Sequence, residues 1–168
     1  MDARRDAAPG GATHLLDLWL AKMSLPMRDM DVRMMNPLQM AYVGDAVHAL
    51  FVRTRLFAGG ENVGRMHKHS NRCVSAAAQS QMLLRLEPRL TEEEAQIVRR
   101  GRNAHAHHAA PKNADPADYS RATALEALLG YLFLTGRGDR LAELMEAALP
   151  DALLPQGAKG TKQEETHG

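Results

Sequence analysis

Two apolar segments, each containing a single acidic side chain, constrain the fold of this chain more than any other feature. Between Pro37 and Leu50 the only charged residue is Asp45, and between Ala122 and Thr135 it is Glu126. Segments of this kind are typical of helices at the centre of a bundle, buried on most sides. An unpaired ionised carboxylate there would cost several kcal/mol, so each acid must be paired, neutralised or bound to a cation.

The rest of the chain also follows a helical period. Aromatic residues make up only 4% of the sequence, and no stretch alternates apolar and polar side chains as a strand does, so we predict an all-α bundle. Asn36 before Pro37 predicts a capped helix start, and Thr91 followed by Glu94 has the spacing of a capping box. The predicted helices cover about 13–23, 37–57, 62–73, 75–86, 91–103, 118 or 120 to 136, and 139–149.

A length of 168 residues suits one domain with one core. We predict an N-terminal extension over 1–35, a helical domain over 36–150 and a tail over 151–168, with the first 11 or so residues and the tail disordered. The single cysteine, Cys73, excludes a disulfide framework and cysteine-based zinc sites. No apolar run is long enough to span a membrane, and Met1–Gly11 lacks the apolar stretch of a signal peptide, so we expect a cytoplasmic protein.

Charge is segregated along the chain although the net charge is only +1. Residues 46–86 hold six Lys or Arg and one acid, and a second basic cluster runs from Arg99 to Arg102 and continues at Lys112. Such a distribution predicts a basic surface able to contact phosphates. Charge alone fits equally well with solvated helix faces and with basic residues that complement a helix dipole.

The residues beside the two acids indicate what they could hold. Gly44 and Gly130 each cost about 1 kcal/mol relative to alanine inside a helix, which indicates close backbone packing at these positions. Two carboxylates converging from neighbouring helices could hold Mg²⁺, with water and substrate phosphate completing the shell. The alternative is that each acid forms a buried ion pair, for example with Arg53 or Arg121. The histidines of 105–108 lack the cysteine or HExxH partners of a zinc site.

Several blocks of the sequence resemble those of a known family. Residues 36–47, NPLQMAYVGDAV, resemble the signature helix of ribonuclease III, and more closely that of its short bacterial form, Mini-ribonuclease III, which lacks a double-stranded-RNA-binding domain. Further similar blocks follow in the family's order: Met66–Lys68, Val74–Gln79, Thr91–Glu94, Arg100–Ala104, Pro111–Asp115 and Thr123–Leu132. Each block alone is a weak signal, but the ordered series over about 36–149 is highly specific.

The resemblance implies an all-α homodimer whose subunits form a valley for double-stranded RNA. It implies Mg²⁺-dependent hydrolysis that leaves 5′-phosphate and 3′-hydroxyl ends, and a role in maturing the ends of large-subunit (23S) ribosomal RNA. By position, Asp45 matches the signature aspartate and Glu126 the metal-binding glutamate, so both are implied to be catalytic metal ligands. The implied RNA-binding residues are Lys68, Arg100, Arg102, Asn103, Lys112 and Asn113.

Departures from full-length ribonuclease III concern the metal site. That enzyme has glutamates at the positions of Leu38 and Ala41 and an aspartate at that of Thr123, whereas the short form shares Ala41 and Thr123. We therefore expect a weaker hold on the metal, or one that depends more on RNA phosphates. His105 stands where the short form usually has lysine, and the extension before Asn36 is longer than the resemblance predicts.

Two other functions stay open at the level of sequence. One is a non-catalytic helical module that binds duplex RNA or assists ribosome assembly, with the acids as structural remnants. The other is a purely structural interaction protein, for which the basic segments would be irrelevant. Asp45 and Glu126 favour the enzyme, because a scaffold gains nothing from isolated acids in apolar helices.

Overall fold

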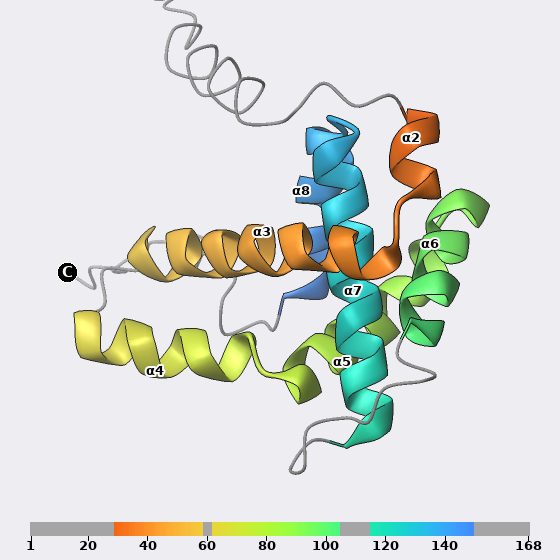
Figure 1. The fold of residues 1–168 in the computed structure, drawn as a ribbon. Coiled ribbons are helices and arrows are strands. Elements are labelled where there is room, and N and C mark those ends of the chain that lie inside the picture. The colour runs from red at the N-terminus through yellow and green to blue at the C-terminus, as the bar shows by residue number, and fades with distance from the viewer. Residues whose placement is uncertain (1–28, 59–61, 105–114, 150–168) are drawn as a thin grey trace, which may run out of the picture.

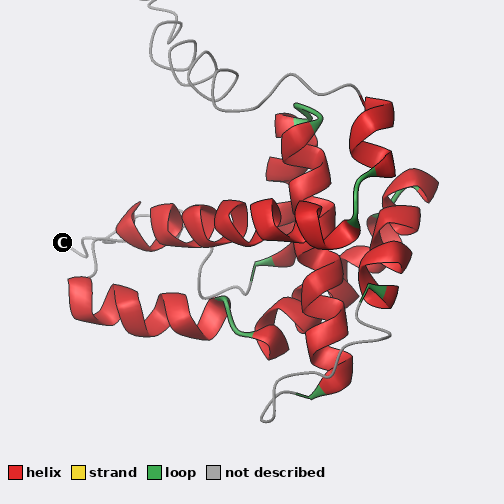
Figure 2. Ribbon diagram, viewed as in Figure 1, coloured by secondary structure: helices red, strands yellow, loops and turns green. Residues whose placement is uncertain are grey.

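The computed structural model describes residues 29–58, 62–104 and 115–149 (Figure 1). Within these ranges every regular element is a helix and none is a strand (Figure 2), so the predicted all-α class is confirmed. No helix there is long and apolar enough to cross a membrane. The elements are α2 (Asp29–Met34), α3 (Pro37–Ala58), α4 (Val63–Cys73), α5 (Ala76–Leu86), the 3-10 turn η1 (Glu87–Arg89), α6 (Glu92–Asn103), α7 (Pro116–Leu134) and α8 (Gly138–Ala148).

Side-chain caps start the helices where the sequence predicts them. Asn36 Oδ1 accepts a hydrogen bond from the Leu38 amide at 2.9 Å, at the start of α3. Asn62 caps α4 in the same way. Thr91 and Glu94 form the complete capping box of α6, each side chain accepting from the other's backbone amide. These bonds satisfy amides that the first helical turn leaves without partners.

Two features differ from the sequence prediction. α7 begins at Pro116 and not at 118 or 120, because Asp115 accepts hydrogen bonds from two amides of the first turn and proline needs no such partner. α2 was not predicted, yet its Val32 is fully buried in the main core, so the helical domain includes residues before Asn36. The predicted helix at 13–23, the predicted terminal disorder and the histidines of 105–108 lie outside the described residues.

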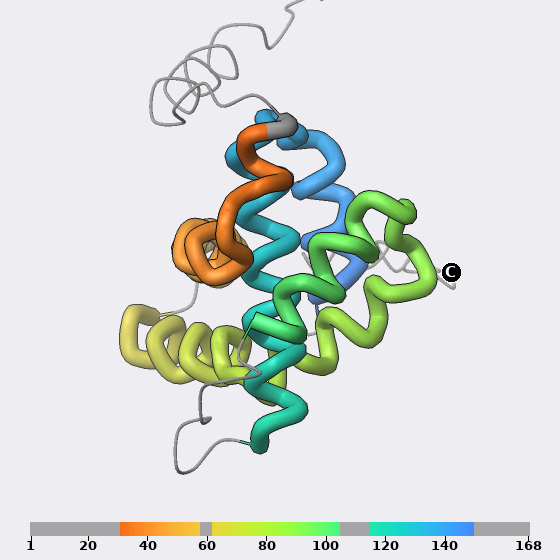
Figure 3. Tube along the Cα trace, turned by 45° about the vertical axis from the view of Figure 1, so that its right-hand side comes forward, coloured from red at the N-terminus to blue at the C-terminus, as the bar shows by residue number. Residues whose placement is uncertain are grey.

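α7 is the central helix of the domain. Ten of its residues are buried, all within Ala122–Leu132, and they lie on every side of the helix. α3 crosses one side of α7, while α5 and α6 lie on the other (Figure 3). α8 packs against α5 and α7. The prediction of a central apolar helix is therefore confirmed for the second segment.

α3 does not match the same prediction. It runs along the edge of the bundle, antiparallel to α4 (Figure 1), and buries Met40 and Val52 on its inner side. Its outer side leaves Tyr42 83% and Leu50 57% exposed, and Asp45 is exposed as well. The apolar side chains of α3 therefore occupy both a buried inner face and an outer face that the single chain leaves uncovered. The prediction that this helix is buried on most sides was wrong.

Candidate metal centre and nucleic-acid interface

The crossing of α3 and α7 brings the two acidic residues together. A Cβ added to Gly44 would lie 1.8 Å from the carbonyl oxygen of Glu126, and one added to Gly130 would lie 1.9 Å from the carbonyl oxygen of Met40. No other residue type fits at either position, so the backbones touch where these glycines meet. The predicted close packing is confirmed, and it places Asp45, the next residue after Gly44, beside Glu126.

The two carboxylates differ in their surroundings. Asp45 is exposed at the rim of the crossing, whereas Glu126 is half-buried on α7. The pKa of Glu126 is raised from 4.5 to about 7, chiefly by burial; a hydrogen bond from Gln79 lowers this pKa, and the negative charge of Asp45 raises it. Because negative charges on the two carboxylates repel each other, a cation between them would relieve the repulsion.

Neither acid has a basic partner within the described residues. The ion pairs there use other carboxylates, and Arg121 pairs with Asp118 at 3.7 Å. The buried-ion-pair alternative to a metal site therefore has no support in this part of the chain. A half-buried carboxylate without a compensating positive charge is costly, which explains why Glu126 holds its proton so strongly.

The two carboxylates are suited to a hard divalent cation. Carboxylate oxygens are the hard ligands that Mg²⁺ prefers, and this ion usually takes one or two carboxylates and completes its shell with water and substrate phosphate. No group of three or more His, Cys, Asp or Glu that could hold a metal occurs in the described residues. Asp45 and Glu126 could therefore supply two ligands, leaving the other positions to water and phosphate.

Behind the two acids lie a histidine and a glutamine that the sequence analysis did not assign. His48 and Gln79 are 0% and 2% exposed, and the Gln79 Nε2 atom lies 3.1 Å from His48 Nδ1. Burial lowers the pKa of His48 to about 4, although the nearby Asp45 charge favours the protonated form. Their sequence signal was faint: His48 lies one turn after Asp45 in an apolar segment, and Gln79 follows three alanines.

Comparison with known proteins decides which family has this arrangement. The family model described as "Ribonuclease III domain" matches residues 38–137, which include both acids and both crossing glycines. The chain belongs to the ribonuclease III family. This match confirms the family that the sequence blocks indicate.

The relatives are the short form of ribonuclease III. A protein named Mini-ribonuclease 3 from Symbiobacterium thermophilum is 51% identical over 113 residues, covering 67% of this chain and 86% of that protein. Its namesake from Brevibacillus brevis is 49% identical over 119 residues, covering 70% and 88%. A crystal structure of a Fusobacterium nucleatum protein superposes with a TM-score of 0.62 at 28% identity, covering 68% of this chain and 92% of that one.

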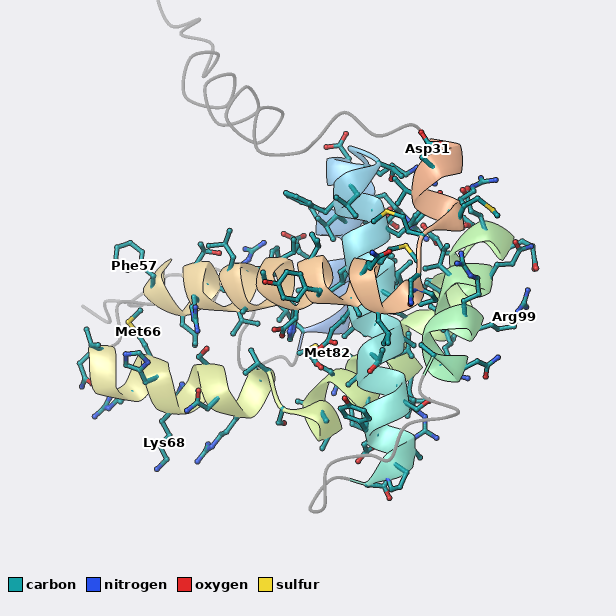
Figure 4. All side chains as sticks on the ribbon, viewed as in Figure 1. Asp31, Phe57, Met66, Lys68, Met82 and Arg99 are labelled. Carbon is teal, nitrogen blue, oxygen red and sulfur yellow. The ribbon has the colours of Figure 1, made fainter. Side chains whose placement is uncertain are left out.

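Among the RNA-contact residues implied by the ribonuclease III resemblance, Lys68 lies on an open basic surface. It is exposed on α4 and points away from α3 (Figure 4). Arg65, His67 and Arg72 are also exposed on this helix, and its sequence, VGRMHKHSNRC, contains no acid. α4 therefore presents positive charge beside the helix that carries Asp45. Of the basic residues on α4, the family resemblance had implied only Lys68 as an RNA contact.

The other implied RNA contacts lie elsewhere. Arg100 donates hydrogen bonds to the carbonyl oxygens of Arg33 and Met35, so it joins α6 to the end of α2. Arg102 forms an ion pair with Glu87, and its side chain is 36% exposed. Asn103 is exposed at the end of α6. The remaining two, Lys112 and Asn113, lie outside the described residues.

Proposed function

We propose that this protein is a metal-dependent endoribonuclease that cleaves double-stranded RNA and leaves 5′-phosphate and 3′-hydroxyl ends. Membership of the ribonuclease III family supports the endoribonuclease activity. The observation that carries the metal dependence is the convergence of Asp45 and Glu126 at a glycine crossing without a basic partner in the described residues. In this proposal both are catalytic residues and ligands of Mg²⁺.

The two acids take different parts in this chemistry. Mg²⁺ would supply positive charge to the scissile phosphate and make a nucleophilic water more acidic. Glu126, half-buried on the rigid central helix, fixes the inner side of the site. Asp45, at the exposed rim, is accessible to a phosphate backbone. Because the protein offers few ligands, RNA phosphate oxygens would complete the shell of the metal, which would couple metal binding to substrate binding.

RNA recognition in this proposal rests on backbone contacts and helix shape. The grooves of A-form RNA expose sugar hydroxyls and phosphates and give side chains little access to base identity. The exposed basic face of α4, with Lys68, is the part of the described surface best suited to phosphate contacts. The other proposed contacts are Arg100, Arg102, Asn103, Lys112 and Asn113. Binding should weaken steeply with added salt as counterions are released.

The active form is proposed to be a homodimer. Tyr42, Leu50 and Phe57 of α3 are 83%, 57% and 76% exposed in the single chain, which is costly for apolar side chains gathered on one helix. A second copy packed on α3 would cover them and bring two metal sites to one duplex. One small domain without an accessory RNA-binding domain has little surface for a duplex, so the dimer also extends the RNA-binding surface.

The natural substrate is proposed to be a ribosomal RNA precursor, at the ends of 23S RNA, processed in the cytoplasm. This follows the role associated with the short form of the family. Purified protein would be incubated with a precursor that contains the base-paired 23S ends, and with the same strands kept single. Cleavage confined to the duplex, giving 5′-phosphate ends in Mg²⁺ and no products in EDTA, is the expected result. Duplex binding without cleavage would contradict the proposed enzyme activity and favour a non-catalytic RNA-binding module.

A further inference from the structure

Gln79 connects the candidate metal site to the protein interior. It lies on α5, only 2% exposed, where a carboxamide without hydrogen bonds would be strongly unfavourable. Its Nε2 atom lies 3.1 Å from Nδ1 of His48 on α3, and its side chain also hydrogen-bonds Glu126 on α7. One side chain therefore links the three helices that meet behind the two acids.

The hydrogen-bonding roles in this chain of residues follow from the groups themselves. With the Gln79 nitrogen as donor, His48 Nδ1 accepts, the ring is neutral and its hydrogen is on Nε2, an atom that has no hydrogen-bond partner among the described residues. The Gln79 side chain also hydrogen-bonds the Glu126 carboxylate, as a donor to it when the carboxylate is ionised. The Gln79 side chain thus has two partners, one on α3 and one on α7. This arrangement fixes the orientation of the carboxamide as well as that of the histidine ring.

We propose that Gln79 is a positioning residue of the metal site: held by His48, it orients the Glu126 carboxylate toward Asp45. This inference rests on the proposed function, because it assumes that Glu126 is a metal ligand. Outer groups that hydrogen-bond a ligand commonly change metal affinity by about 10- to 100-fold when they are removed. Glu126 is especially dependent on such a donor, since it has no basic partner among the described residues.

The geometry also explains why the histidine is needed. A glutamine side chain has several rotatable bonds, and ordering it against one acceptor costs conformational entropy. His48 is 0% exposed and packed beside the α3–α7 crossing, so its ring offers a fixed acceptor. Gln79 is therefore already oriented before metal or RNA arrives. A structural role alone would be satisfied by the bond to His48 and would not require the second bond to Glu126.

The test compares Gln79→Met with Gln81→Met, which makes the same substitution two residues along α5 at an exposed position. Calorimetric titration with Mn²⁺ as the probe should show about 10- to 100-fold weaker binding for Gln79→Met and unchanged binding for Gln81→Met. Duplex RNA affinity in EDTA should be equal in both variants. Cleavage by Gln79→Met should recover as Mg²⁺ is raised, which a purely structural defect would not produce.

Equal Mn²⁺ affinity of Gln79→Met and wild type would overturn the inference while leaving the proposed function intact. Absence of Mn²⁺ binding and of cleavage in the wild type would instead overturn the proposed function. If Gln79→Met does not fold, Gln79→Asn keeps the carboxamide but is one methylene too short to reach both partners. If Gln79→Asn folds and binds Mn²⁺ more weakly than wild type, the inference is supported. If it folds and binds Mn²⁺ as tightly as wild type, the inference is contradicted.

Discussion

Replacing Glu126 by glutamine should stabilise the metal-free protein above neutral pH while it abolishes cleavage. The folded state holds the Glu126 proton up to a pKa of about 7, whereas the unfolded chain releases it near 4.5. Between these values the folded state binds more protons than the unfolded state, so stability falls as pH rises. The difference of 2.5 units, at about 1.4 kcal/mol each, is a penalty of about 3 kcal/mol at pH 8.

Glutamine has nearly the same shape and no charge, so Glu126→Gln should recover most of this penalty. In EDTA at pH 8 the variant should unfold at a temperature roughly 10 °C higher than wild type, and at pH 5 the difference should fall to less than about 1 kcal/mol. Glu146→Gln, at an exposed site on α8, should show no such pH-dependent gain. A Glu126→Gln protein that is no more stable than wild type at pH 8 would refute the electrostatic account of the site.

Three other predictions concern the crossing, the metal and the dimer. Gly44→Ala should destabilise the fold by at least about 3 kcal/mol in urea unfolding, because the added Cβ would lie 1.8 Å from a backbone carbonyl oxygen. The control is Gly138→Ala, where an added Cβ has nothing within 4 Å; this change should stabilise the fold by about 0.5 kcal/mol. Equal effects of the two changes would contradict the close crossing. Mn²⁺ affinity should be about tenfold lower at pH 6 than at pH 8, because protons compete with the metal for Glu126 around its pKa of about 7. If calorimetry shows the same Mn²⁺ affinity at both pH values, Glu126 is not a ligand. Leu50→Asp should halve the mass measured by light scattering, since it puts a charge in the proposed α3 interface, and a dimer that survives it would place the interface elsewhere.

Much of the helical arrangement could be predicted because its signals are local. A cap such as Asn36 or Thr91 acts within one turn, so the residue type and spacing are sufficient to place it. Gly44 and Gly130 were equally informative, because a glycine inside an apolar helix needs a packing reason. α2 escaped prediction because six residues are too few to show a helical period, and it is held by tertiary contacts such as the burial of Val32.

The candidate site was predictable only in part for a related reason. Asp45 and Glu126 stood out as single charges in apolar segments, but the sequence could not show that one is exposed and the other half-buried. That difference depends on where α3 crosses α7, which is a property of the whole fold. His48 and Gln79 are neutral polar residues whose importance comes from meeting across helices, 31 positions apart. No local pattern marks such a pair.

Arg100 shows a further limit of sequence reasoning. Its place in a basic cluster predicts an RNA contact, while the structure shows its guanidinium donating to carbonyl oxygens at the end of α2. An arginine has five N–H donors and can bind both, but the contact to α2 makes it important for folding as well. Loss of RNA binding in an Arg100 variant would therefore need a measurement of stability beside it.

The most direct test of the account is the single-turnover cleavage of duplex RNA by Asp45→Asn, beside wild type and the exposed control Asp139→Asn. Asparagine keeps the shape of Asp45 and removes its charge. The account predicts metal-dependent cleavage by wild type and Asp139→Asn, and duplex binding without cleavage by Asp45→Asn. Cleavage by Asp45→Asn at the wild-type rate in Mg²⁺ would contradict the assignment of this crossing as the metal centre.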